Sequence, residues 1–180
     1  MREAHHLVKN KFIETFNEEP IIVRSPGRVN LIGEHTDYNM GYVLPAAINK
    51  AAYLAIKERD DDIIFIVAAD LNESFTTTVE RCNYSERGWP NYVICIVDQL
   101  LKINKKIKGF NAVISGDVPL GAGMSSSAAL ECATIFALNH IFELGLDKFE
   151  MVKLAQKGEN EFVGVNCGIM DQFASVFGKK

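Results

Sequence analysis

The stretch Pro119-Leu-Gly-Ala-Gly-Met-Ser-Ser-Ser-Ala-Ala129 joins a strand-like segment to a helix-like segment, in the form of a phosphate-binding loop. Gly121 and Gly123 permit backbone angles that are closed to other residues, and they leave space for a ligand beside the backbone. Three serines follow at 125–127, where unpaired N–H groups and the positive end of the helix dipole attract anions. The stretch therefore predicts a site for the phosphates of a ligand.

An ordinary glycine turn before a serine-capped helix is the alternative interpretation of this stretch, since serine is a common N-cap residue. The stretch is not a G-x-x-x-x-G-K-[ST] loop, because no lysine occurs between Lys108 and Lys148. Backbone dipoles, hydroxyl groups and a metal ion would then have to neutralise the phosphate charge.

A second stretch, Gly27-Arg-Val-Asn-Leu-Ile-Gly-Glu-His-Thr-Asp-Tyr-Asn39, is dense in polar groups of different kinds. Arg28 is a fixed cation with five donors, which suits oxygen-rich anions. Glu34 and Asp37 can accept hydrogen bonds from hydroxyl groups, and His35 can donate or accept. Several such groups in a glycine-bounded loop favour a sugar ligand over an apolar one. A surface loop with solvated charges is the alternative.

A third stretch, Cys167-Gly-Ile-Met-Asp-Gln-Phe173, places Asp171 after a glycine and between apolar residues. Arg28 is the cation that we expect to pair with Asp171 if the fold brings them together. The alternative is that Asp171 only caps a helix. Glu159, on the helix expected before this stretch, could hold a metal ion or face water.

The composition is that of a globular protein with one domain over residues 1–180, since 48% of residues are hydrophobic and 23% are charged. A formal net charge of −4 argues against a nucleic-acid surface. The cysteines at 82, 95, 132 and 167 lack C-x-x-C spacing, so neither a zinc site nor a disulfide framework is expected. With no long apolar run and no signal-peptide core, we expect a cytoplasmic protein without membrane contact.

Hydrophobic periodicity predicts strands early in the chain and helices late, which is typical of the α+β class. The strands are expected at 21–24, ended by Ser25-Pro26-Gly27, at 63–67 paired with 75–79, and half-buried at 110–116, with a further extended segment beginning at 174–177. The helices are expected at 4–16, 91–107, 125–144 and 148–162.

Together the three stretches resemble the galactokinases, members of the GHMP family of small-molecule kinases. The matching segments are GRVNLIGEHTDYNMGY at 27–42, PLGAGMSSSAA at 119–129 and CGIMDQF at 167–173. Their order and spacing cover nearly the whole chain. The resemblance implies an N-terminal GHMP-kinase domain with a mixed β-sheet packed against helices on one side. It also implies ATP-dependent phosphorylation of galactose at its anomeric hydroxyl, giving galactose 1-phosphate.

The same resemblance implies a role for each matching position. Asp171 would be the catalytic carboxylate that accepts the sugar proton, and Arg28 would steady it. The sugar site would comprise Glu34, His35, Thr36, Asp37, Gly168 and Asp171. The ATP phosphates would lie against Gly121, Ala122, Gly123, Met124, Ser125, Ser126 and Ser127. Mg²⁺ would be ligated by Ser127 and Glu159, and Trp89 would lie near the nucleotide.

Members of the family also carry a further glycine-rich motif and a second lobe, which this sequence lacks. We therefore expect little kinase activity from these 180 residues alone. Another sugar 1-kinase, such as an N-acetylgalactosamine kinase, and a non-catalytic galactose and ATP sensor are the alternatives. The expected partners are galactose and ATP, with no nucleic acid, no membrane and no obligate protein partner.

Overall fold

One five-stranded mixed sheet, with the strand order β1-β2-β5-β3-β4, forms the centre of the computed structural model, which describes residues 2–33, 35–39, 41–119 and 121–178. The strands are β1 (Ile21–Ile32), β2 (Leu44–Glu58), β3 (Ile63–Ala68), β4 (Glu73–Thr78) and β5 (Phe110–Gly116). The helices are α1 (Arg2–Phe16), α2 (Asn91–Lys102), α3 (Ser126–Ile141), α4 (Lys148–Gly158) and α5 (Met170–Phe177). Short 3₁₀ turns span Asp37–Asn39 and Val79–Arg81, and a π-helical turn spans Glu159–Val163.

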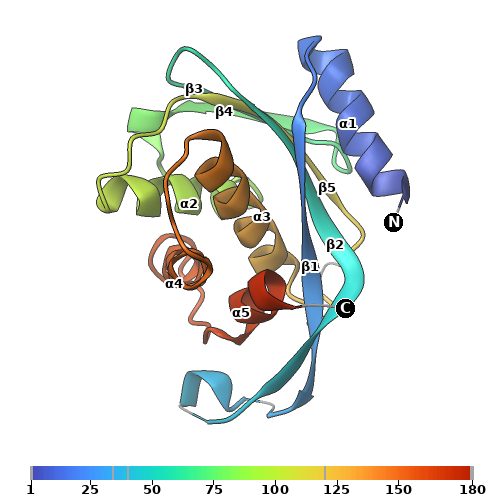
Figure 1. Ribbon diagram of the computed structural model, residues 1–180, viewed down its shortest axis with the longest axis vertical. Coiled ribbons are helices and arrows are strands. Elements are labelled where there is room, and N and C mark those ends of the chain that lie inside the picture. Colours follow the sequence, from blue (N-terminus) through green and yellow to red (C-terminus); the bar gives the residue numbers. More distant parts are fainter. Residues whose placement is uncertain (1, 34, 40, 120, 179–180) are drawn as a thin grey trace.

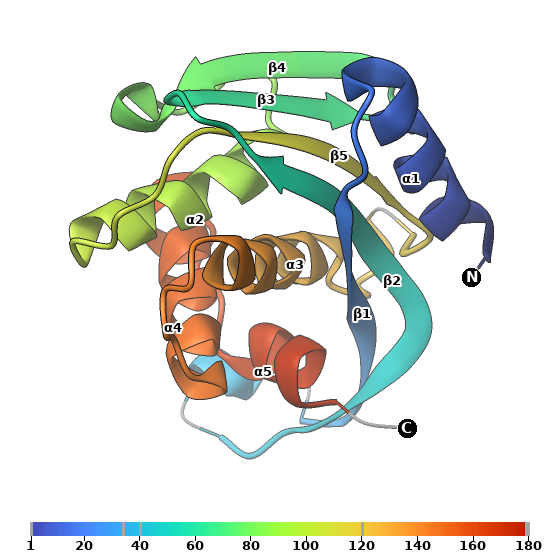
Figure 2. The same cartoon turned by 45° about the horizontal axis from the view of Figure 1, so that its top comes forward.

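Helices α2 to α5 cover one face of the sheet, and α1 lies on the opposite face (Figures 1 and 2). The α3 helix packs against β1 and β2, while α2 and α4 pack against α3. Neighbouring strands are antiparallel except for β3 and β5, which run parallel. The predicted α+β fold, with a mixed sheet and a helical layer on one side, is confirmed. The α1 helix is an addition on the other side.

Strand β5 is buried on both faces, whereas its alternating sequence predicted a half-buried strand. It lies between β2 and β3, with α1 against one face and the main helical layer against the other. Phe110, Ala112 and Ile114 contribute to the larger core, and Val113 contributes to the core beneath α1. A central strand thus loses the polar face that its sequence suggested.

Strand β1 continues through Ser25-Pro26-Gly27, where the sequence predicted that it would end. Among the described residues it is an edge strand that pairs only with β2, so the missing N–H of Pro26 need not break a ladder. The pairing shifts register between Pro26 and Arg28. At Gly27 a side chain would lie 2.7 Å from the Met124 carbonyl oxygen, which explains why the phosphate loop can approach this strand closely.

The segment at 174–177 is helical, so the prediction of an extended segment there is wrong. Apolar runs this short do not distinguish a strand from a helix. Packing decides the outcome, because Gln172, Ala174 and Ser175 are buried in α5. The Ser175 hydroxyl donates to the carbonyl of Pro26 at 2.8 Å and ties α5 to β1.

Most of the other predicted elements are confirmed, with shifted ends. The helix predicted at 91–107 stops at Lys102, and the helix predicted at 148–162 changes to a π-helical turn at Glu159. Such π-turns are rare and often occur at functional sites. In the described part of the chain, no helix has the length and apolar character needed to cross a membrane.

The α4 helix begins at a capping box that fixes the element leading to Glu159. Asp147 accepts hydrogen bonds from the N–H groups of Phe149 and Glu150, and Glu150 accepts one from the N–H of Asp147, all at 2.8 Å. We predict that Asp147→Ala lowers the free energy of unfolding by about 1 kcal/mol. Asp147→Asn, which keeps a capping oxygen, should unfold close to the parent in urea. Equal losses in the two variants would contradict this account.

Candidate active site

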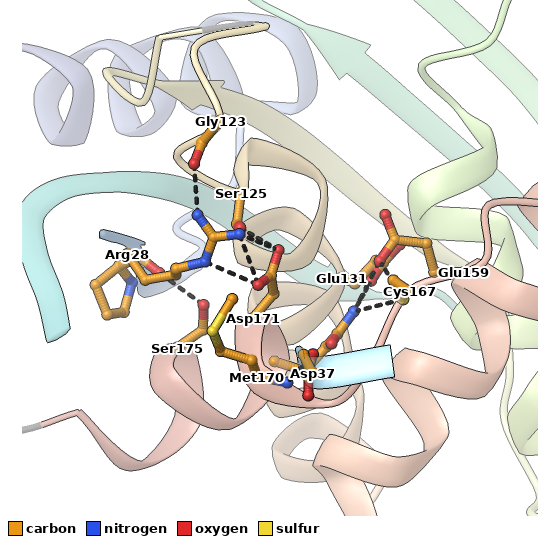
Figure 3. A network of polar contacts seen from close by, with 12 residues as sticks. Arg28, Asp37, Gly123, Ser125, Glu131, Glu159, Cys167, Met170, Asp171 and Ser175 are labelled. Atoms are coloured by element: carbon orange, nitrogen blue, oxygen red, sulfur yellow. Dashed lines mark hydrogen bonds and ion pairs between the residues drawn. The ribbon is translucent and has the colours of Figure 1, made fainter. Parts of the chain in front are cut away.

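An ion pair between Arg28 on β1 and Asp171 on α5 lies at the centre of the candidate active site (Figure 3). Arg28 Nε and Nη2 donate to Asp171 Oδ1 and Oδ2, each at 2.8 Å. The two side chains are only 14% and 22% exposed. This planar two-point contact is the strongest arrangement that a guanidinium and a carboxylate can make.

Arg28 also binds the predicted phosphate loop, so the loop and the aspartate share one cation. Its Nη1 donates to the carbonyl of Gly123, and its backbone N–H donates to the carbonyl of Met124 at 3.2 Å. The hydroxyl of Ser125 donates to Asp171 Oδ2. The loop, β1 and α5 therefore meet at a single cluster of charged and polar groups.

The phosphate loop has the unusual backbone that its glycines predicted. Gly121 and Gly123 have φ values of 70° and 65°, and Ser125 has a φ of 57°. The positive φ is strained for a serine, and the hydrogen bond from its hydroxyl to Asp171 helps to hold it. The α3 helix begins at the next residue, Ser126, so its free N–H groups face the loop. Ala122 is exposed within the loop.

A cavity of about 460 Å³ opens beside the loop. Gly121, Ser126 and Ser127 line one part of it, and Trp89 and Tyr92 line another. The Trp89 indole N–H donates to Glu73 at 2.8 Å, which fixes the ring at the cavity wall. A cavity with a flat aromatic group and the predicted phosphate loop in its wall has the parts expected of a nucleotide site.

The polar loop after β1 lies next to the start of α5. Asp37 Oδ2 accepts a hydrogen bond from the N–H of Met170 at 3.0 Å. An added side chain at Gly168 would lie 1.9 Å from that same oxygen, so only glycine leaves room for Asp37 here. The structure thus brings Asp37 and Gly168 together, and Gly168 precedes Asp171 by three residues in the sequence.

The other residues predicted for the sugar site differ in their surroundings. His35 is exposed, and its Nδ1 lies 2.6 Å from the Tyr38 hydroxyl. The Thr36 hydroxyl is used within the loop, where it bonds to the carbonyls of Gly33 and Tyr42. Thr36 therefore shapes the loop. Glu34 lies outside the described residues.

A second, buried network lies beside the ion pair, and the sequence did not predict it (Figure 3). Gln172 Nε2 donates to Glu159 Oε2 at 2.8 Å and contacts Glu131 Oε2 at 3.3 Å. Cys167 Sγ donates to Glu159 Oε2 at 3.2 Å. The available signal was Glu131 itself, a single charge inside the apolar run Ala128-Ala-Leu-Glu-Cys-Ala-Thr-Ile-Phe136.

The pKa of Glu131 is held well above its usual range, mainly by burial and secondly by the charge of Glu159. Burial likewise raises the pKa of the Cys167 thiol, as does the charge of Glu159. Tyr92, on the cavity wall, also has a raised pKa, mainly from burial and then from the charges of Glu159 and Glu131.

The two residues predicted to ligate a metal ion are Ser127 and Glu159, and no contact joins them among the described residues. Ser127 lines the cavity, and Glu159 is 5% exposed. Within the described ranges, no group of three or more acidic, histidine or cysteine side chains could hold a metal by itself. A hydroxyl and one carboxylate nevertheless suit Mg²⁺, which takes its remaining ligands from water and phosphate.

Two family models match the chain. The model described as GHMP kinases N terminal domain matches residues 91–179, which include the phosphate loop and Asp171. The model described as galactokinase galactose-binding signature matches residues 10–58, which include Arg28 and Asp37. Both halves of the candidate site therefore lie within matched regions.

The chain is similar to curated galactokinases from several organisms. It is 44% identical to that of Roseiflexus sp. (strain RS-1) over 96% of the chain and 44% of the relative. It is 48% identical to that of Pyrococcus furiosus over 89% of the chain and 45% of the relative. The chain thus spans about half the length of the curated relatives that it matches.

A solved galactokinase has a similar structure. The Lactococcus lactis enzyme, crystallised with galactose, matches with a TM-score of 0.88 and 38% identity. The match covers 95% of this chain and 46% of that one. The two proteins therefore share a fold over nearly the whole of this chain.

The buried position of Glu131 leads to a prediction about stability and pH. Above pH 4.5, its ordinary value, Glu131 ionises in the unfolded chain but keeps its proton in the folded one. The free energy of unfolding therefore falls as pH rises from there toward the folded-state pKa. Because Glu131→Gln mimics the neutral acid, it should be more stable than the parent at neutral pH, by roughly 1–3 kcal/mol.

This difference should disappear at acid pH, where Glu131 is protonated in both the folded and the unfolded state. Urea unfolding of both proteins between about pH 4 and pH 8 measures it. A stability difference that does not vary with pH would contradict the buried, protonated state of Glu131.

Proposed function

This chain belongs to the GHMP kinase family, and on that premise we propose that it supplies the phosphoryl-transfer site of a galactokinase. The reaction would transfer the terminal phosphoryl group of ATP to the anomeric hydroxyl of galactose. The observation that carries the proposal is the position of Arg28, which contacts both Asp171 and the carbonyl of Gly123. Because the chain spans about half the length of its relatives, the activity is proposed for the protein with the remaining length present.

On the acceptor side, Asp171 would take the proton of the anomeric hydroxyl as the phosphorus–oxygen bond forms. Arg28 holds this carboxylate in one orientation through two hydrogen bonds, and a general base requires such a fixed position. Asp37, next to Gly168, has a second oxygen without a hydrogen-bond donor among the described residues, so it could bind a sugar hydroxyl. His35, which is exposed, would bind a further hydroxyl, and the family resemblance gives Glu34 the same role.

On the donor side, the cavity beside Trp89 would hold the nucleoside, with the phosphates at residues 121–127. Phosphoryl transfer depends mainly on alignment and on stabilisation of charge. The loop N–H groups and Arg28 supply fixed positive charge at the place where donor and acceptor meet. Ser127 and Glu159 are the residues that would hold Mg²⁺, which when bound would neutralise charge on the phosphate oxygens.

Sugar-dependent ADP release tests the proposal directly. A protein that includes the remaining length of its relatives should phosphorylate galactose in preference to glucose, mannose and N-acetylgalactosamine. The 180-residue chain should show little turnover. Preference for N-acetylgalactosamine would indicate the related 1-kinase, and binding of both ligands without product would indicate a sensor.

Replacing the proposed base is the first functional prediction. Asp171→Asn keeps the shape of the side chain but cannot accept a proton. We predict that kcat falls by about 10²- to 10⁴-fold while the KM for ATP changes little. A steady-state assay measures both constants, with thermal melting as a check on folding. A variant that retains most of its kcat would show that Asp171 is not the base.

The contact between Gly168 and Asp37 gives a second functional prediction. In Gly168→Ala the new methyl group displaces the Asp37 carboxylate. The KM for galactose should rise by roughly 10- to 100-fold, since small misplacements in a site are costly, and the KM for ATP should stay near the parent value.

Gly145→Ala is the matched control, since Gly145 has a φ of 69° and an added Cβ would meet nothing within 4 Å. It introduces backbone strain in the loop between α3 and α4 without touching Asp37. Its effect should appear in thermal melting and not in KM. Equal changes of the galactose KM in both variants would rule out the proposed role of Gly168.

A further inference from the structure

Two consecutive residues at the start of α5 serve two different parts of the site. Successive helical residues point about 100° apart, so Asp171 reaches Arg28 while Gln172 enters the core. There Gln172 Nε2 donates to Glu159 Oε2 at 2.8 Å and contacts Glu131 Oε2 at 3.3 Å. Figure 3 shows the two groups of contacts side by side, with Glu131, Glu159 and Cys167 forming the second group.

This second group lowers the stability of the protein core, because buried polar groups lose their contacts with water. Glu131 and Gln172 are fully buried, and Glu159 is 5% exposed. Among the described residues no lysine, arginine or histidine forms an ion pair with either carboxylate, and Glu131 Oε1 and Gln172 Oε1 have no hydrogen-bond partner. Apolar side chains of the same size would fill this space at lower cost. The arrangement is therefore better explained by a function than by stability.

The hydrogen bonds of Glu159 indicate what that function is. Its Oε2 accepts from both Gln172 and Cys167, whereas its Oε1 has no donor among the described side chains and N–H groups. The carboxylate is thus fixed through one oxygen, with the other left available. Glu131 follows Ser127 by one turn of α3, so the same helix carries the proposed hydroxyl ligand and the support for Gln172.

We propose that Gln172, braced by Glu131, is a positioning residue that fixes Glu159 by Oε2 and leaves Oε1 for a divalent cation at the nucleotide phosphates. This inference rests on the proposed function, in which Glu159 helps to hold Mg²⁺. Mg²⁺ requires near-ideal octahedral geometry, so a rigid carboxylate binds it better than a mobile one. The first turn of α5 then sets the positions of both the metal-binding carboxylate and Asp171.

Binding of Mn²⁺ as a spectroscopic probe tests the proposal on the 180-residue chain. Mn²⁺ affinity in the presence of ADP is measured by electron paramagnetic resonance, and ADP affinity without metal is measured separately. Gln172→Met should weaken Mn²⁺ binding by about 10- to 100-fold, the usual loss when a hydrogen-bond partner of a metal ligand is removed. ADP binding without metal should be unchanged.

Matched variants separate positioning from general damage to the core. Glu131→Leu should weaken Mn²⁺ binding like Gln172→Met, whereas Glu131→Gln keeps an acceptor oxygen and should restore it. Gln99→Met is the control, because Gln99 is also fully buried and also contacts two carboxylates, Asp98 and Glu161. Its Mn²⁺ affinity should equal that of the parent.

The possible failures are distinguishable. If the parent binds Mn²⁺ with ADP and Gln172→Met binds it equally well, the inference is overturned and the proposed function stands. If the parent binds ADP but never Mn²⁺, then Glu159 does not hold a metal ion, and both that proposed role and this inference are wrong. A metal-free measurement guards against misfolded variants: the Gln172 side-chain amide should exchange slowly with solvent in ¹⁵N NMR, and fast exchange would overturn the inference.

Discussion

The two-point contact between Arg28 and Asp171 is the interaction on which the rest of the site depends. It joins residues 143 positions apart in the sequence, one on an edge strand and one on the last helix. The same guanidinium binds the phosphate loop, so three segments are held by a single cation. A lysine could supply the charge but not the geometry, since it lacks the planar fork that contacts several acceptors at once.

The sequence was sufficient to predict the unusual backbone of the candidate phosphate loop, where Gly121 and Gly123 have positive φ values. Two glycines and a run of serines between a strand and a helix indicate a phosphate loop because backbone conformation and free N–H groups are local properties. The pairing of the strands at 63–67 and 75–79 was likewise predictable from β-branched residues. The family resemblance then connected these local signals to one fold, and the comparisons agree with it.

What the sequence could not predict depended on position in the fold. Pro26 did not end β1, because an edge strand has a side that needs no N–H donor. The segment at 174–177 became helical because Gln172 is anchored to α3 and to the π-helical turn at Glu159, and Ser175 is anchored to β1. No pattern within the segment reveals those contacts. The network of Glu131 and Glu159 also joins residues from separate helices, so the sequence around either residue could not predict it.

In the proposed reaction, the acceptor hydroxyl of the sugar meets the terminal phosphate at Asp171, beside the candidate phosphate loop. A crystal structure with galactose and a non-hydrolysable ATP analogue tests it most directly. We expect the anomeric hydroxyl to lie within about 2.6–3.2 Å of an Asp171 oxygen, on the side that faces the terminal phosphate. A sugar bound with that hydroxyl turned away from Asp171, or a nucleotide bound away from residues 121–127, would contradict it.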